Sequence, residues 1–307
     1  MQLNKLNEQA KQLNLSAVTI SKGLRYGMFD SLFLGQGIEF DSCREYSLND
    51  DIRYIDWNLT ARSGRPFIKL YKEEHDVTIF VIVDASASMH SFSEIGISYF
   101  EKAIELASLF LFAGQHLNCQ VGGLVFAEEI KKFWMPKTGK DFVFSIIHSL
   151  QKFSSKENSG SDLNLAFDIA GKILDKHSLI IIISDFKIKN YADKLSVLTK
   201  FHDVIALKIF SKFDRELPKA GLLPIYDTEN KQSIFVNTLS KKNIQDYEKK
   251  FLQKIIAWEN FCIDAGVLPC KISVKDNSVK VLNDFLLSAE NKYEAINLFK
   301  RKQAQVI

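Results

Sequence analysis

The sequence predicts an α/β protein in which helices cover both faces of a doubly wound, mainly parallel sheet of the Rossmann type. The first observation is a pair of uninterrupted apolar runs, Val77 to Val83 and Leu179 to Ile183. Their lack of polar alternation is typical of strands buried on both faces. The second observation is that strand-like segments alternate with segments whose apolar residues have helical spacing. Such alternation favours parallel strands joined by helices.

Taken in order, the elements follow from apolar periodicity and from turn residues. Helices are expected at 3–13, 93–115, 140–153, 163–173, 191–201, 241–265 and 279–287. Strands are expected at 67–70, 77–83, 121–126, 130–135, 179–183, 204–210, 222–228, 233–237 and 271–274. The strand at 130–135 ends at Pro136 and reads as an edge strand, because proline cannot donate a ladder hydrogen bond. The segments 222–228 and 233–237 read as a hairpin.

The chain divides into an N-terminal segment, residues 1–75, with a small β-rich region, and a larger α/β domain, residues 76–307, that includes the hairpin, the long helix and the last strand. A net charge of +3 is too small to indicate nucleic-acid binding. No apolar run approaches the ~18 residues of a membrane span, and the N-terminus lacks the apolar core of a signal peptide. Four cysteines without C-x-x-C spacing are expected to be reduced in a cytoplasmic protein.

Oxygen-bearing side chains follow both buried strands. Asp84, Ser86 and Ser88 come directly after the first apolar run, and Asp185 follows the second. If the two strands are neighbours, the carboxylates of Asp84 and Asp185 lie side by side, and their repulsion favours either a bound proton or a cation between them. Hard carboxylate and hydroxyl oxygens suit Mg²⁺. The simpler alternative is that one serine merely caps the following helix.

The sequence Asp84-Ala-Ser86-Ala-Ser88 resembles the metal-ion-dependent adhesion site of von Willebrand factor A domains. The resemblance implies that a later loop supplies a hydroxyl, here Ser161 in place of the family's threonine, and that a third loop supplies Asp185. It also implies that these residues together bind Mg²⁺ or Mn²⁺, and that the ion takes its last ligand from a carboxylate of a partner. On this basis we expect a non-enzymatic protein-interaction module.

A second resemblance rests on the region before the first buried strand. Arg44-Glu-Tyr, Asn49-Asp-Asp, Arg53-x-Ile-Asp-Trp57 and Ala61-Arg62 are similar to the signature of the domain of unknown function 58 family, with Asn49 at the place of a glycine. The resemblance implies a MoxR-type AAA+ ATPase as partner, and a role in chaperone-like assembly or maturation of a client protein. The region 44–62 fits an internal brace or a partner surface equally. We predict that Asp56, Trp57 and Arg62 are mainly structural and tie the N-terminal segment to the sheet.

Two other functions stay open at this point. Asp84 could be the nucleophile of a Mg²⁺-dependent phosphoryl-transfer enzyme, but Ser86 stands where such phosphatases carry their second carboxylate, the general acid. The sequence also has no glycine-rich phosphate loop and no Gly-x-Ser-x-Gly motif. The third possibility is a scaffold whose metal site is inactive, since serine at position 161 lacks the methyl group that stiffens a threonine side chain.

Overall fold

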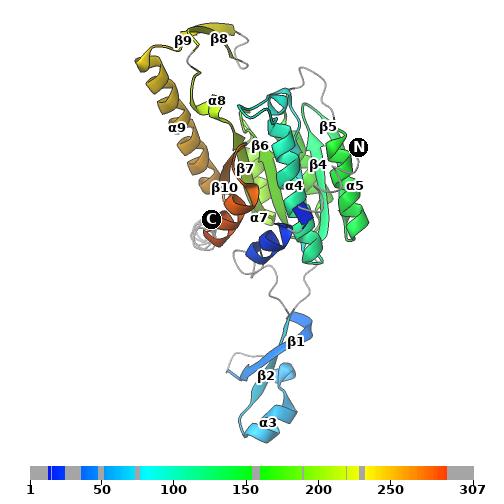
Figure 1. The fold of residues 1–307 in the computed structure, drawn as a ribbon. Coiled ribbons are helices and arrows are strands. Elements are labelled where there is room, and N and C mark those ends of the chain that lie inside the picture. The colour runs from blue at the N-terminus through cyan, green and yellow to red at the C-terminus, as the bar shows by residue number, and fades with distance from the viewer. Residues whose placement is uncertain are drawn as a thin grey trace.

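The computed structural model describes residues 13–14, 16–24, 36–47, 52–72, 77–153, 160–188, 190–218, 220–227 and 232–288. Its centre is a six-stranded sheet with the order β10-β7-β6-β3-β4-β5 (Figure 1). All neighbouring strands are parallel except β5, which is antiparallel to β4 at one edge. The six strands are β3 (Thr78–Asp84), β4 (Gln120–Phe126), β5 (Ile130–Lys137), β6 (Ser178–Ser184), β7 (Asp203–Phe210) and β10 (Leu268–Ser273). The predicted fold class is confirmed.

The two central strands are buried along their whole length. Every residue of β3 and of β6 is buried, and successive side chains enter different cores because strand side chains alternate between the two faces. Phe80 and Ile82 of β3 belong to one core, whereas Ile79 and Val81 belong to the other. The uninterrupted apolar run therefore reflects a strand with a hydrophobic layer on both sides.

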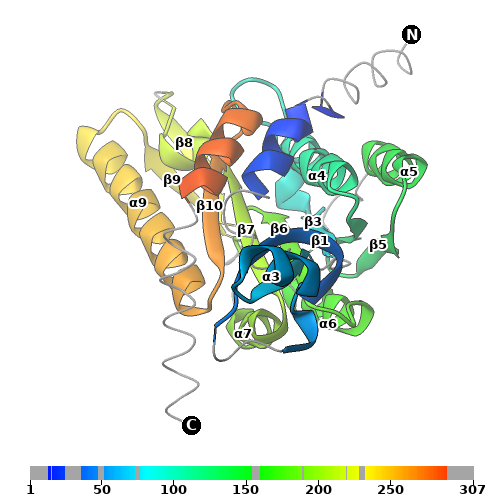
Figure 2. The ribbon, with the colours of Figure 1, turned by 90° about the horizontal axis from the view of Figure 1, so that it is seen from below.

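Helices form the outer layers of the sheet (Figure 2). One face is covered by α4 (Tyr99–His116), α5 (Lys140–Gln151) and the helical segments 16–24 and 278–288. The other face is covered by α6 (Leu163–Ile173), α7 (Ala192–Phe201) and α9 (Lys241–Asp264). The carboxyl ends of the parallel strands lie together at one side of this three-layer arrangement, where connecting loops follow the strands.

The first helix after β3 begins later than predicted. The structure starts α4 at Tyr99, whereas the apolar spacing predicted a start near Ser93. Ser98 accepts a hydrogen bond from the Glu101 backbone N–H, and the Glu101 carboxylate accepts one from the Ser98 N–H, so a capping box fixes the start. Residues 91–98 form a turn instead. The helix predicted at 3–13 lies almost wholly outside the described residues.

Two small sheets lie outside the central sheet. After the short helix α8 (Lys212–Arg215), β8 (Leu222–Asp227) and β9 (Gln232–Asn237) form the predicted hairpin. The strands β1 (Gln36–Glu45) and β2 (Phe67–Lys72) pair with each other, with the 3-10 turn η1 (Ile52–Tyr54) and α3 (Trp57–Ser63) between them in the chain. The boundary predicted after residue 75 falls on residues outside the described ranges.

The predicted structural role of the signature residues is only partly right. The Asp56 carboxylate caps α3 by accepting hydrogen bonds from the backbone N–H groups of Asn58 and Leu59, both at 3.0 Å. Trp57 is 67% exposed, however, and Arg62 is exposed as well. The expectation that these two side chains tie the segment to the sheet is wrong, because neither is packed in a core.

Candidate metal centre

The ends of β3 and β6 bring the two predicted aspartates to the same edge of the sheet. The two strands are parallel neighbours, in register from Thr78 with Ser178 to Val83 with Ile183. Asp84 is the last residue of β3, and Asp185 directly follows β6. Both are buried, Asp84 completely and Asp185 to 98%. The adjacency on which the sequence prediction depended is therefore present.

Asp84 is the centre of a set of hydroxyl and amide donors. The Ser184 Oγ donates to Asp84 Oδ2 at 2.6 Å, and the Ser86 backbone N–H donates to Asp84 Oδ1 at 2.8 Å. The Ser161 Oγ lies 3.3 and 3.4 Å from the two carboxylate oxygens. The Ser86 and Ser88 hydroxyls are 3.2 Å apart within the turn that follows β3, where the short 3-10 helix η2 (Ala87–His90) starts. The hydroxyls of Ser86 and Ser161 thus lie around one carboxylate, with that of Ser88 beside Ser86.

The position of Ser161 is fixed by its neighbours in the chain. The Asp162 backbone N–H donates to the Ala127 carbonyl at 2.8 Å, which attaches this loop to the segment after β4. The Asp162 carboxylate also accepts hydrogen bonds from the N–H groups of Asn164 and Leu165 at the start of α6. Asp162 is therefore an N-cap residue, and it holds the preceding Ser161 at the sheet edge.

Burial makes the charge of Asp84 unfavourable. Loss of hydration, and next the negative charge of Asp185, raise the pKa of Asp84 to about 6, although hydrogen bonds from Ser184 and Ser86 act in the opposite direction. The negative charge that a second buried carboxylate adds beside Asp84 favours a cation at this edge. Asp185 Oδ2 is buried and accepts no hydrogen bond from the described residues.

A lysine that sequence analysis did not single out lies at the same edge. The Lys187 Nζ is 3.5 Å from Asp185 Oδ2 and 3.1 Å from Asp214 Oδ1. Burial disfavours the charged ammonium, but the two carboxylates outweigh this effect and raise the pKa of Lys187. Lys187 therefore carries one positive charge beside the carboxylates. Its side chain is half-exposed, so it can move without disturbing the core.

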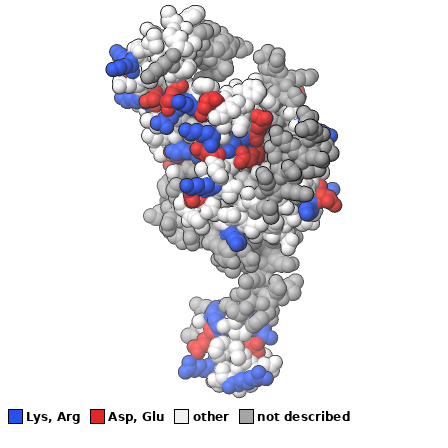
Figure 3. Space-filling model, viewed as in Figure 1, with Lys and Arg blue, Asp and Glu red and all other residues white. Residues whose placement is uncertain are grey.

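Further polar groups extend the network away from the predicted residues. The Tyr99 hydroxyl donates to Asp214 Oδ2 and lies 2.8 Å from the Ser211 Oγ. Lys208 of β7 donates to the Asp185 carbonyl and lies over the rings of Phe186 and Trp258. Burial is the main reason that the pKa of Lys208 falls to about 8. Figure 3 accordingly shows basic and acidic side chains next to each other around α8, instead of a surface of one sign.

The donor set fits a hard divalent cation. It consists of two carboxylates and three hydroxyls, all oxygen ligands of the kind that Mg²⁺ and Mn²⁺ prefer. In the part of the chain that the structure describes, no group of three or more His, Cys, Asp or Glu residues is arranged to hold a metal, so a softer, nitrogen- or sulfur-rich site is not found there. The buried Asp185 Oδ2 accepts no hydrogen bond from the described residues, and its ion-pair partner Lys187 is half-exposed, so a metal ion can take the place of the ammonium group there.

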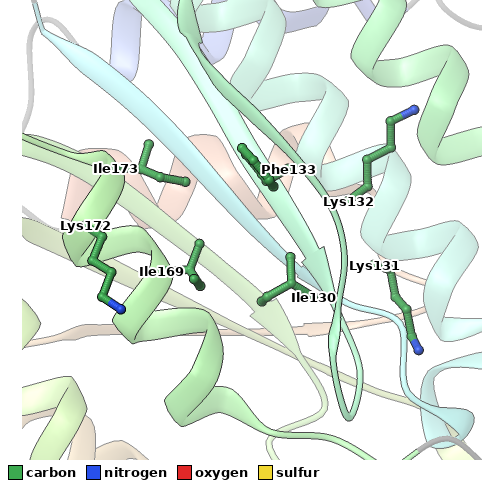
Figure 4. A pocket seen from close by; sticks show the side chains of 7 residues that line it. All are labelled: Ile130, Lys131, Lys132, Phe133, Ile169, Lys172 and Ile173. Carbon is green, nitrogen blue, oxygen red and sulfur yellow. The ribbon is translucent and has the colours of Figure 1, made fainter.

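A hollow between β5 and α6 is chemically different from this edge. Its volume is about 460 Å³. It is lined by Ile130, Lys131, Lys132, Phe133, Ile169, Lys172 and Ile173. Figure 4 shows the apolar side chains between the strand and the helix, with the lysines around them. No carboxylate or hydroxyl lines this hollow, and we therefore place the candidate site at the carboxyl edge.

The strand order and the helices on both faces of the sheet give the chain a von Willebrand factor A-like fold. The chain belongs to the family described as protein of unknown function DUF58, whose model matches residues 42–255. It is similar to uncharacterized proteins of Mycobacterium bovis and Mycobacterium tuberculosis, each 25% identical over 231 residues, which are 74% of this chain and 72% of the relative.

The chain is also similar to solved structures, including the following two. The conserved hypothetical protein BatB from Bacteroides thetaiotaomicron is 16% identical, with a TM-score of 0.43 over 69% of this chain and 98% of BatB. The VWA domain of SpRpn10 is 11% identical, with a TM-score of 0.38 over 68% of this chain and 93% of that domain. Within the described ranges, no helix combines the length and the apolar character needed to cross a membrane.

Proposed function

We propose that this protein is a non-enzymatic, divalent-metal-dependent protein-interaction module of the cytoplasm. Mg²⁺ or Mn²⁺ would be held by Asp84, Ser86, Ser88, Ser161 and Asp185. The observation that carries the proposal is the convergence of hydroxyls on the buried Asp84, next to a second buried carboxylate whose charged neighbour is the half-exposed Lys187. Three of these five ligands are neutral hydroxyls, so the ion can still take a carboxylate from a partner as a further ligand.

The partner class comes from the family resemblance. We propose a MoxR-type AAA+ ATPase, acting with this protein in assembly or maturation of a client that presents a carboxylate. What the chain itself adds is the position of the site among loops at the carboxyl ends of the strands, where Ser88 and Ser161 are only partly buried. Ser86 stands where a phosphoryl-transfer enzyme would need its second carboxylate, and this supports binding rather than catalysis.

Metal binding is tested by isothermal titration of the purified chain with MgCl₂ or MnCl₂. Wild type should bind one ion, and Asp84→Asn and Asp185→Asn should lose binding. Asp168→Asn is the matched control, because it removes a carboxylate that pairs with Lys194 at 2.6 Å, away from the edge. Equal binding by all three variants, or no binding by wild type, would contradict the proposed centre.

The partnership is tested by capture with the candidate MoxR-type ATPase purified separately. Capture should occur in Mg²⁺, disappear in EDTA and weaken in Ser88→Ala, which removes one hydroxyl while leaving both carboxylates. Capture that is equally strong in EDTA would place the interface elsewhere, most simply on the region 44–62. Turnover of p-nitrophenyl phosphate that depends on Asp84 would instead favour the phosphoryl-transfer alternative.

A further inference from the structure

The turn between η2 and α4 exposes apolar side chains beside the candidate metal centre. This 91–98 turn comes three residues after Ser88 in the chain. Phe92 is 68% exposed, Ile95 50% and Ile97 39%. Exposed apolar side chains scattered singly need no explanation, but three within six residues next to a candidate binding site form a patch. The helix predicted at 93–115 included Ile95 and Ile97, so this patch was not foreseen.

Hydrogen bonds within the turn hold it in one shape. The Ser93 backbone N–H and its Oγ both donate to the Ile97 carbonyl, at 2.9 and 2.7 Å. The Gly96 N–H donates to the Ser93 carbonyl at 3.0 Å, and Gly96 has a φ of 74°, a conformation that glycine adopts without strain. Ser93 is buried beneath the turn. The exposed side chains are thus displayed by an ordered backbone.

Contacts at both ends attach the turn to the site edge. The Ser91 N–H donates to the Ser88 carbonyl, and the Tyr99 N–H donates to the Ser91 carbonyl, both at 3.2 Å. The Glu94 carboxylate accepts a hydrogen bond of 3.1 Å from the Lys212 N–H at the start of α8. The turn is therefore built onto the segment that carries Ser86 and Ser88, and a partner bound at the metal would lie next to it.

We propose that the 91–98 turn is the apolar half of a two-part binding surface, whose occupant is a partner segment carrying an aspartate or glutamate next to aromatic or aliphatic side chains. The inference rests on the proposed function, because the acidic side chain is matched to the divalent ion and to the cationic Lys187 at the same edge. The apolar neighbours of that acidic residue are matched to Phe92, Ile95 and Ile97. A rigid surface of this kind binds with little ordering cost.

The probe is a random peptide library displayed on phage, panned against the immobilised full chain in Mg²⁺ and in EDTA. Enriched peptides are then synthesised with a fluorophore and titrated with wild type and variants. Phe92→Ser and Ile95→Ser test the turn. Phe133→Ser is the matched control, since it removes another exposed phenylalanine, 53% exposed on the edge strand β5. Thermal melting verifies that each variant is folded.

In Mg²⁺ we expect peptides that combine an acidic residue with adjacent apolar residues. Phe92→Ser and Ile95→Ser should weaken their binding at least tenfold, with Phe133→Ser within twofold of wild type. Metal-dependent acidic peptides that have no apolar preference, or that bind Phe92→Ser normally, would overturn the role of the turn and leave the metal function standing. Absence of any metal-dependent acidic peptide would overturn the proposed function itself. Apolar peptides that need Phe92 equally in EDTA would overturn the two-part surface.

Discussion

The Ser184 hydroxyl donates a hydrogen bond of 2.6 Å to Asp84, and so joins the ends of two neighbouring parallel strands. Ser184 is completely buried, and its Oγ also accepts a hydrogen bond from the Phe186 N–H at 3.0 Å. The hydroxyl therefore stabilises the Asp84 carboxylate and, at the same time, the backbone turn after β6, where Phe186 has a φ of 49°. Ser184 positions both aspartates, although it is outside the predicted ligand set.

The raised pKa of Asp84 predicts that, without metal, this residue's contribution to the free energy of unfolding decreases as pH rises. Because the folded-state pKa of about 6 exceeds the unfolded value near 4, folding takes up a proton between these pH values. This carboxyl group therefore favours the folded state below about pH 4, and its contribution is lost as pH rises to 6. A shift of about two units corresponds to at most about 3 kcal/mol.

Urea unfolding in EDTA between pH 4 and 7.5 measures this effect, with Asp84→Asn as the reference. The difference in free energy of unfolding, wild type minus variant, should fall as pH rises through 6. Parallel curves for the two proteins would show that Asp84 titrates normally.

Replacement of Lys187 should separate metal affinity from stability. Lys187→Met removes the ammonium group that lies 3.5 Å from Asp185 and 3.1 Å from Asp214. In EDTA the variant should lose about 1–2 kcal/mol of unfolding free energy, less than a fully buried pair because the lysine side chain is half-exposed. Mn²⁺ should bind several-fold more tightly, since no cation then competes for Asp185. Unchanged or weaker Mn²⁺ binding would show that Lys187 does not compete with the ion for Asp185. Lys194→Met is the control, because Lys194 pairs with Asp168 instead.

Tyr99→Phe should destabilise the connection between α4 and α8. The hydroxyl donates to Asp214 and lies 2.8 Å from Ser211, so its loss leaves a buried hydrogen-bonding group with one partner fewer. We expect a loss of about 1–3 kcal/mol in chemical denaturation, because hydrogen bonds to charged groups are among the stronger ones. Tyr247→Phe, whose hydroxyl makes only a 3.3 Å bond to the Phe213 carbonyl, should change stability less. Equal effects would refute this ranking.

In the β1–β2 region, Asp56 should contribute more to the stability of α3 than Arg62 does. Asp56→Ala removes the N-cap of α3 and the ion pair with Lys69 at 3.8 Å, so the local stability of α3 should fall. Arg62→Ala changes an exposed side chain and should stay within about 0.5 kcal/mol of wild type. Hydrogen exchange of the α3 amides distinguishes the two variants. Faster exchange in Arg62→Ala than in Asp56→Ala would contradict this assignment.

The features that sequence analysis predicted well are those with a strong local signal. The buried strands β3 and β6 were recognisable because their apolar runs lack alternation, and the paired aspartates follow from the ends of those runs. The predicted start of α4 was wrong because residues 93–98 contain enough apolar side chains to continue the helical spacing. Gly96 and the Ser98 capping box, which are local signals, end that pattern.

Lys187 and Asp214 could not be paired from sequence. They come from different loops, and a lysine after an aspartate has no distinctive spacing. Trp57 was expected to be structural because it is an aromatic residue flanked by opposite charges, but its side chain is 67% exposed. The contacts that decide such cases are tertiary, so no periodicity within one segment reveals them.

The separation of the site residues along the chain has a consequence for synthesis on the ribosome. Ser184 and Asp84 are 100 residues apart, and their strands pair only when β6 docks beside β3. A chain that has emerged only as far as β4 has the Asp84 loop but lacks the partners that orient it. Long-range strand pairing of this kind forms slowly, after local helices and turns. The proposed metal centre is therefore assembled only late in synthesis, because an incomplete nascent chain lacks the strand that brings Ser184 and Asp185 beside Asp84.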